Sequence, residues 1–321
     1  MAELPRWDRR ADDVERNVAR IDAWSTTLLD SGLVRAFGGE EPALRSADTA
    51  LRLAALERFA AATWDFRSGR ERNLAATAEF SPAQTELILR TGLELGLTGT
   101  PGPSKPFYDA VIMTGGMVRA GIVKPRFLRE LEARGLDWSR AVFLGASRPF
   151  LGDEVELAAR LGVSGGNEID AMRVGMARAF DLGEVGSTDA GGTGFDSWLW
   201  LDWPKGTRRF QVVAAPSSEP QLRRANTEDT FRYWASRSTG VQSLLVITTP
   251  VYVPYQGAVS VEVFGADSGM AVETVAVSAS ANYLGADTQL FGPQQVLQEL
   301  RAAVHGMRRL FDRLGVSTES A

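Results

Sequence analysis

The feature that most constrains the fold is an alternation of short apolar runs with amphipathic segments, which begins near residue 107. Small or polar residues follow each run at once, and the segments between the runs carry apolar residues at helical spacing. The runs are Ala110–Met113, Ala141–Leu144, Phe210–Ala215 and Ser243–Thr248. Strands that alternate with helices favour parallel pairing through right-handed crossovers, so we predict an α/β fold with a doubly wound, mostly parallel, Rossmann-like sheet.

Helices are predicted between these strands, and further strands and a closing helix after them. The expected helices are Lys124–Arg134, Asn167–Phe180, Thr227–Ser236 and Pro293–Leu314, and the additional strands lie near Val259–Val263 and Glu273–Val277. Between Asp181 and Arg209, a glycine-rich and then tryptophan-rich stretch is longer than an ordinary connection. It predicts a hairpin or a lid over the site.

The first part of the chain has a different, helical pattern, so we divide the sequence in two. Residues 1–98 predict an all-α domain or cap, in which Ser81 caps a helix that begins at Pro82. Prolines and glycines in residues 99–106 sustain neither helix nor strand and predict a linker. Residues 107–321 then form the predicted ligand-binding α/β domain.

The residue types present limit the chemistry. The chain has no cysteine and a single histidine, His305, which excludes thiolate metal sites, cysteine nucleophiles and histidine clusters. We therefore predict no metal site and expect chemistry from carboxylates, hydroxyls, arginines, backbone amides or a cofactor. The formal charge of −5 provides no overall field for nucleic acid or an anionic membrane, although a local basic groove stays allowed. The charged N-terminus lacks the apolar core of a signal peptide, so a cytoplasmic protein is expected.

Small and polar residues stand at the ends of the predicted strands, where open parallel sheets bind ligands. They are Thr114, Gly115, Gly116, Gly145, Ser147, Arg148, Ser217, Thr248 and Thr249. Together they predict a crevice for a polar or phosphorylated small molecule. A glycine pair after a strand is also what a tight turn requires, and the sequence holds neither a G-x-G-x-x-G fingerprint nor a phosphate loop.

Two clusters at predicted helix starts carry carboxylates, Asn167 to Asp170 and Asn226-Thr227-Glu228-Asp229. One interpretation is helix capping, because these residue types are preferred there. In the other, Glu168 and either Glu228 or Asp229 point into the crevice, where they orient ligand hydroxyls or act as a general base.

The order of short motifs between Tyr108 and Phe264 carries a resemblance. A strand that ends in Gly-Gly precedes a helix with Arg126, and a strand that ends in Gly-x-Ser-Arg precedes an Asn-Glu helix with Met172. The segments Asn226–Asp229 and Leu245–Tyr252 follow. In this order the chain resembles the YdcF/SanA/ElyC-like family. The resemblance implies a Rossmann-like domain with a pocket at the strand ends, S-adenosylmethionine binding as in YdcF-type members, and envelope-related roles as in SanA- and ElyC-type members.

Carried over to this chain, the family's functional positions fall on residues already singled out. They are Gly115 and Gly116 in the turn, Glu168 at the helix start, the pair Asn226 and Thr227, and Thr248 and Thr249 at the strand end. Tyr252 stands near the family's usual histidine and Gln256 near its arginine, which puts any chemistry of those two groups in doubt here. The additional N-terminal helices and the absence of a membrane anchor put an envelope role in doubt.

These observations lead to one functional hypothesis and two alternatives. The hypothesis is a nucleoside-type cofactor such as S-adenosylmethionine, or a phosphorylated metabolite, bound at the strand ends, with group transfer by positioning as the economical chemistry. One alternative is a non-catalytic sensor or partner-binding module, whose N-terminal helices contact another protein or a second copy. The other is a hydrolase or transferase of nucleotide-linked or cell-wall precursors, with a divalent ion at the carboxylates.

Overall fold

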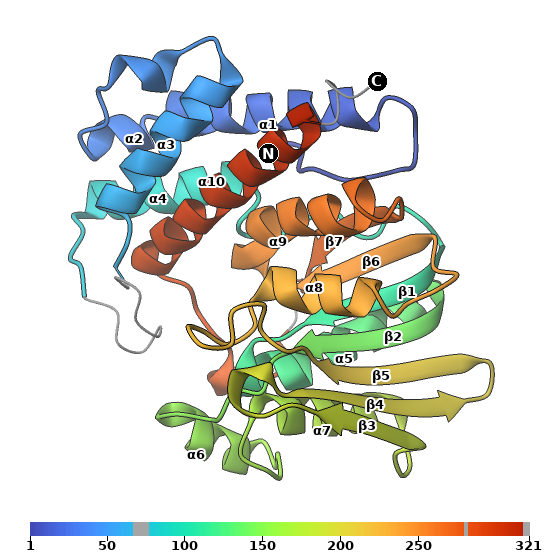
Figure 1. Ribbon diagram of the computed structural model, residues 1–321. Coiled ribbons are helices and arrows are strands. Elements are labelled where there is room, and N and C mark those ends of the chain that lie inside the picture. Colours follow the sequence, from blue (N-terminus) through green and yellow to red (C-terminus); the bar gives the residue numbers. More distant parts are fainter. Residues whose placement is uncertain (67–76, 279–281, 317–321) are drawn as a thin grey trace.

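A seven-stranded sheet forms the centre of the protein, in the order β3-β4-β5-β2-β1-β6-β7 (Figure 1). The computed structural model describes residues 1–66, 77–278 and 282–316. The strands are β1 (Phe107–Thr114), β2 (Asp137–Gly145), β3 (Ser187–Gly191), β4 (Trp198–Lys205), β5 (Arg208–Ala214), β6 (Ser243–Thr248) and β7 (Ala271–Ala276). Neighbours from β5 to β7 are parallel, whereas β3 and β4 add an antiparallel edge. The predicted mostly parallel α/β fold is confirmed.

Helices cover both faces of this sheet. They are α1 (Asp13–Asp30), α2 (Leu33–Ala36), α3 (Thr49–Thr63), α4 (Pro82–Glu94), α5 (Met117–Ala133), α6 (Asp153–Arg160), α7 (Glu168–Phe180), α8 (Thr227–Ala235), α9 (Val253–Ser260) and α10 (Pro293–Val316). Apolar side chains of α5 and α7 pack on one face, and those of α8, α9 and α10 belong to the core on the other.

The strand order reverses beside β1. From β1 the chain continues through α5 to β2 and later to β5 on one side, whereas β6 and β7 lie on the other side. The crossovers that leave neighbouring strands β1 and β6 therefore run in opposite directions. In open parallel sheets, ligands bind outside the carboxyl ends of the strands at such a reversal.

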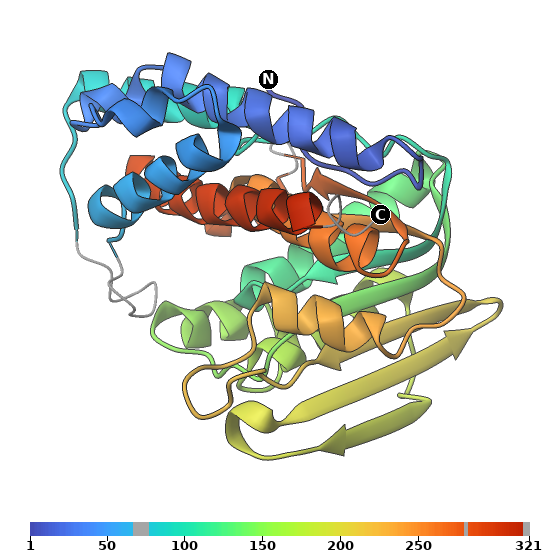
Figure 2. The same cartoon turned by 45° about the horizontal axis from the view of Figure 1, so that its top comes forward.

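The N-terminal helices and the α/β part share one hydrophobic core. It joins Trp24 of α1 and Leu56 of α3 to Leu300 of α10 and Val246 of β6. Figure 2 shows α10 lying between the N-terminal helices and the rest of the molecule. The predicted Ser81 cap is confirmed, since its side chain accepts from the amide of Gln84 as part of a capping box. Residues 67–76 of the predicted helical segment lie outside the described residues.

One predicted strand is wrong. Val259–Val263 is helical, because α9 ends at Ser260 and continues into a π-helix over Val261–Ala266. Nearly every residue of this segment is buried between β7 and α10, so it shows no polar face and its apolar run cannot be distinguished from a buried strand. The other late strand, near Glu273–Val277, is confirmed as β7.

The glycine- and tryptophan-rich stretch forms the β3–β4 hairpin at the sheet edge. Trp203 is buried, and Trp198 and Trp200 are partly buried against the core. The turn of the hairpin lies at the carboxyl edge of the parallel strands, where the carbonyl of Phe195 accepts from the amide of Ser217 at 2.8 Å. The hairpin therefore forms one wall of that edge.

Candidate functional site

The turn after β1 is shaped around one carboxylate. Glu168 is 5% exposed, and its Oε1 accepts from the amides of Gly116 at 2.6 Å and Met117 at 2.9 Å. Gly116 has φ 152° and Met117 has φ 64°, a left-handed value that costs a residue with a side chain about 1–2 kcal/mol. The carboxylate complements the positive amino end of α5, because it accepts from amides that the helix leaves without intrahelical partners.

Two of the predicted glycines lie so close to this carboxylate that a side chain at either position would contact it. A Cβ on Gly115 would lie 2.8 Å from Oε1 of Glu168. A Cβ on Gly145 would lie 2.8 Å from Sδ of Met172 and 3.2 Å from Oε2 of Glu168. A side chain at Gly115 or at Gly145, the last residue of β2, would therefore displace the α7 side chains that approach the strand ends.

Lys124 of α5 lies beneath the same turn. The side chain is buried, and its Nζ donates to the carbonyl of Thr114 at 2.5 Å, to Oγ1 of Thr114 at 2.8 Å and to the carbonyl of Gly115 at 3.2 Å. Burial lowers the pKa of Lys124 to about 7, and the charge of Glu168 opposes that shift. Residues 114–116, which we call the glycine turn, thus lie between the amino group of Lys124 and the carboxylate of Glu168.

A hydrogen-bonded chain of polar side chains joins β1 to β6. Oγ1 of Thr114 lies 3.2 Å from Oγ1 of Thr248 and 3.0 Å from Oε1 of Gln256, which also accepts from Thr248. The Nε2 of Gln256 donates to Oγ1 of Thr227 at 3.2 Å. This network places side chains from β1, β6, α8 and α9 together at the strand reversal.

The structure therefore brings together one group of the predicted residues: Thr114, Gly115, Gly116, Gly145, Glu168, Thr227 and Thr248. Sequence reasoning missed Lys124 as a site residue. The only signal was that Lys124 is one of three lysines in a chain that otherwise uses arginine, which does not indicate burial.

The other predicted strand-end residues lie around this group. Ser147 is exposed and Arg148 is partly buried, and the carbonyl of Arg148 accepts from the amide of Glu168 at 2.8 Å. Thr249 precedes a short 3₁₀ helix, and the ring of Tyr252 lies 6.4 Å from that of Phe291. Ser217 is buried, and its Oγ accepts from the amide of Glu219 at 3.0 Å. The loops after β2, β5 and β6 supply these residues.

Capping accounts for Asn226 and Asp229. The Oδ1 of Asn226 accepts from the amide of Asp229 at 2.9 Å, and Oδ2 of Asp229 accepts from the amide of Asn226 at 2.9 Å. Arg223 also donates to Asp229 and helps to hold the pKa of that carboxyl below its usual value, although burial opposes this effect. The pair begins α8 and so fixes the position of Thr227.

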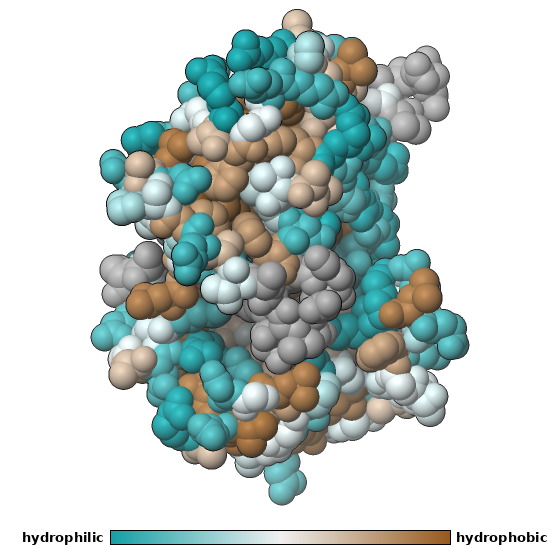
Figure 3. Space-filling view, turned by 90° about the vertical axis from the view of Figure 1, so that its left-hand side faces the viewer, coloured by the Kyte–Doolittle hydropathy of each residue, from teal (hydrophilic) through white to brown (hydrophobic). Residues whose placement is uncertain are grey.

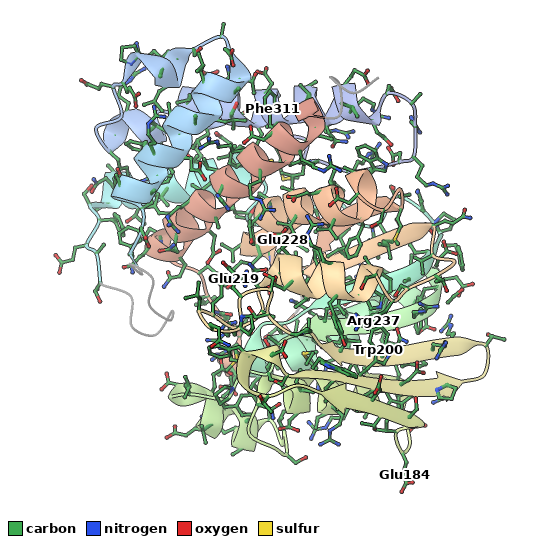
Figure 4. The ribbon with its side chains drawn as sticks, viewed as in Figure 1. Glu184, Trp200, Glu219, Glu228, Arg237 and Phe311 are labelled. Carbon is green, nitrogen blue, oxygen red and sulfur yellow. The ribbon has the colours of Figure 1, made fainter. Side chains whose placement is uncertain are left out.

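Glu228 faces a different set of charges. The hydrogen bond from Arg309 of α10, with a second from Arg232, lowers the pKa of Glu228 to about 2. Both arginines also contact Glu262, so the cluster connects α8, α10 and the π-helix. Figure 4 places Glu228 at the beginning of α8. A carboxylate with such a low pKa is a weak base at neutral pH, and its contacts hold helices together.

Exposed apolar side chains occur in the loops at the carboxyl edge of the sheet. Loops around the carboxyl edge carry Leu151, Phe195, Leu222 and Leu290, of which Leu290 is 87% exposed. Figure 3 looks onto this side of the molecule and shows apolar patches above and below its middle. A few convergent polar groups within apolar surroundings are typical of small-molecule sites.

Two further findings concern the described residues, 1–66, 77–278 and 282–316. None of their histidine, aspartate and glutamate side chains forms a group of three arranged to hold a metal ion. None of their helices is both long and apolar enough to cross a membrane. The single histidine, His305 on α10, contacts Glu57 of α3 at 2.5 Å through Nδ1.

Comparison with known proteins gives relatives whose function is not described. Residues 6–96 match the family model described as the Rv3785 N-terminal domain, which coincides with the N-terminal helices. "Uncharacterized protein Rv3785" of Mycobacterium tuberculosis and "Uncharacterized protein Mb3814" of Mycobacterium bovis are each 26% identical over 324 residues, which cover 92% of this chain and 89% of theirs. No solved structure matches the chain significantly. The similarity to these mycobacterial proteins thus spans both the N-terminal helices and the α/β part.

Proposed function

We propose that the protein binds a nucleoside-type cofactor of the S-adenosylmethionine class at the carboxyl ends of β1, β2 and β6, and that its α/β part is a Rossmann-like domain. The observation that carries the proposal is the strand reversal beside the network that joins Thr114 to Thr248. Such reversals are where open parallel sheets bind ligands. A phosphorylated metabolite is the alternative ligand for the same edge.

The charge of the turn favours the adenosyl ligand over the phosphorylated one. A phosphate usually binds the free amides at a helix N-terminus, but Glu168 already accepts from those of Gly116 and Met117. A phosphate would have to displace this carboxylate or lie beside its negative charge. Ribose hydroxyls and an amino group, by contrast, donate hydrogen bonds that a carboxylate accepts. Glu168 is therefore the proposed polar anchor.

The motif order supports the same ligand class, because the chain resembles the YdcF/SanA/ElyC-like family over Tyr108 to Phe264. Gln256 replaces the family's arginine, and here its amide is hydrogen-bonded within the threonine network. Group transfer by positioning is the proposed chemistry, since it requires no histidine at the site.

A thermal-shift screen tests the proposal. The purified protein is melted with S-adenosylmethionine, S-adenosylhomocysteine, common nucleotides and sugar nucleotides, with and without magnesium. A ligand at a hundred times its Kd stabilises the folded state by about 2.7 kcal/mol, so we expect a clear increase in Tm with both adenosyl compounds. A shift with nucleotides alone would instead favour the phosphorylated ligand, and no shift at all would contradict the proposal.

Two charge-matched variants locate the ligand. Glu168→Gln keeps an oxygen that accepts from the amides of Gly116 and Met117 but removes the charge, so the protein should fold and lose most of the ligand-induced shift. Glu156→Gln removes one negative charge from an exposed position on α6 and should keep the shift. Equal shifts in both variants would place the ligand away from Glu168.

A further inference from the structure

Two adjoining cavities lie on the face of the sheet opposite to α8 and α9, the first between α5 and α7 and the second between the carboxyl end of α7 and the connected ends of β4 and β5. One has a volume of about 250 Å³ and the other of about 340 Å³, and both are lined by Arg129 and Ala179. They form a continuous groove toward the amino ends of the strands, where β5 begins at Arg208. The glycine turn lies at the other end of α5, so this groove is separate from the strand-end site.

Five cationic side chains line the groove: Arg126, Arg129, Arg178, Lys205 and Arg208. Three of them are held by carbonyl oxygens. Arg126 donates to the carbonyl of Tyr283 at 2.9 Å, and Arg178 donates to that of Leu161 at 2.7 Å. Lys205 donates to the carbonyl of Phe180 at 2.8 Å. A carbonyl fixes a cation in place without cancelling its charge, so these side chains keep a net positive field in the groove.

The carboxylates nearby compensate this charge only in part. Arg129 and Arg208 both contact Glu132, and Arg208 also contacts Asp137 at 2.8 Å. Asp181 lines the groove, but its carboxylate points into solvent, 3.9 Å from the Nζ of Lys205. A further carboxylate near Arg126, that of Glu130, is paired with Arg134 outside the lining. The lining cations thus outnumber the carboxylates paired with them, which leaves a positive groove on a chain whose formal net charge is −5. Such a local reversal of sign steers an anionic partner to one place.

The lining favours an acidic peptide over the other common polyanions. Single-stranded nucleic acid stacks its bases on exposed aromatic rings, but Phe180 and Phe210 of the groove are 6% and 3% exposed. Proteins bind an anionic membrane surface through basic residues together with large exposed apolar side chains. Ile122 of the lining is only 4% exposed, so it offers no such apolar contact. Guanidinium forks bind carboxylates in two-pronged geometry, and the methylenes of glutamate can lie on the small apolar lining.

We propose that the groove lined by Arg126, Arg129, Arg178, Lys205 and Arg208 is a docking site for an acidic segment of a partner protein. The segment's carboxylates replace water at the guanidinium groups of α5 and α7. Because the site is separate from the strand ends, the partner binds along the middle and the carboxyl-terminal half of α5, whereas the ligand binds at its amino end.

Fluorescence polarisation with a labelled peptide of eight glutamates tests this docking site, and a peptide of eight glutamines serves as the uncharged probe. We expect the acidic peptide to bind, and its affinity to fall at least tenfold between 50 and 300 mM salt, because salt screens charge-driven association. The double variant Arg126→Gln/Arg129→Gln should weaken binding at least tenfold. Arg58→Gln/Arg313→Gln removes the same charge from ion-paired arginines on α3 and α10 and should leave binding unchanged.

Lys205→Gln provides a second variant on another element, in case the double variant does not fold, and it should also weaken binding severalfold. Three outcomes would overturn the proposal. They are no binding of the glutamate peptide, equal loss in groove and control variants, or tighter binding of a fifteen-nucleotide thymidine strand or of phosphatidylglycerol vesicles than of the peptide. None of these readouts depends on the adenosyl ligand, so the two proposals succeed or fail separately.

Discussion

At the residue scale, the central feature is a lysine and a carboxylate on either side of the glycine turn. Glu168 accepts from the amides of Gly116 and Met117, and Lys124 donates to the carbonyls of Thr114 and Gly115. Between them they satisfy the backbone groups that the turn leaves without partners in the sheet or in α5. Burying two charges for this purpose is costly, which makes the turn sensitive to pH.

The first prediction concerns Lys124. Its folded pKa of about 7 lies below the ordinary lysine value of 10.5, so the unfolded chain binds more protons between these values and stability rises with pH there. By linkage, the free energy of unfolding should increase by about 2 kcal/mol between pH 7 and pH 9. Lys124→Met removes the titrating group and with it this gain. Urea unfolding of both proteins at pH 7, 8 and 9 measures the difference, and parallel pH profiles would contradict the assignment.

The same residues show what the sequence was able to predict. Gly115, Gly116 and Glu168 were found because strand ends and helix starts are local patterns that a sequence displays directly. Lys124 lies ten residues after Thr114, on a helix that the sequence also predicts, but only the packing of α5 against the sheet makes it buried. Burial is a property of the fold, so no local pattern predicts that residue's role.

At the scale of elements, helix starts fix the geometry of the site. Both Asn167 and Asn226 begin a helix through a capping box, and the residue that follows each cap contributes to the strand-end group. Element prediction succeeded at such starts and failed at Val259–Val263, because a helix buried on all sides has no polar face to reveal its period. Capping and amphipathicity are local signals, whereas two-sided burial is not.

The second prediction tests the cap of α8. Asn226→Ala removes the oxygen that accepts from the amide of Asp229, and the loss of such a cap costs about 1 kcal/mol. Asn226→Ser keeps an accepting oxygen and should be close to neutral. Urea unfolding gives both values. A cost of the same size in both variants would show that the cap does not stabilise the start of α8.

The third prediction concerns the ion pairs that join α8 to α10. The pKa of Glu228, about 2, lies below its usual value because Arg309 and Arg232 stabilise the carboxylate. A lowered folded pKa contributes stability above the unfolded value, and this contribution is lost as pH falls from about 4.5 toward 2. Wild-type protein should therefore lose Tm more steeply than Glu228→Gln between pH 5 and pH 3. Equal slopes would show that Glu228 does not contribute to the loss of stability in acid.

At the scale of the whole molecule, the helical and α/β parts form one continuous core. Trp24 of α1 is completely buried and its indole donates to the carbonyl of Leu95 at 3.2 Å, while α10 packs against α3, α4 and α9. Trp7 also pairs with Val272 of β7, so the N-terminal segment contacts the sheet edge itself. A linker pattern in the sequence predicts a break in secondary structure but does not reveal how much surface the two sides bury against each other.

The fourth prediction follows from this shared core. Trp24→Ala should cost about 3–5 kcal/mol, as other large-to-small core substitutions do, and should lower one transition that includes the sheet. In each protein, far-ultraviolet circular dichroism and tryptophan fluorescence should give the same unfolding midpoint as each other, and both midpoints should be lower in the variant than in the wild type. Two separate transitions, of which only the first moves, would mean that the N-terminal helices fold independently.

Hydrogen–deuterium exchange with and without S-adenosylhomocysteine tests whether a small adenosyl ligand binds at the strand reversal between β1 and β6. We expect the ligand to slow exchange in peptides that contain residues 113–118, 145–148 and 247–256, and to leave exchange in peptides from α1 and from the strands of the β3–β4 hairpin unchanged. Unchanged exchange throughout, or protection confined to other parts of the chain, would contradict it.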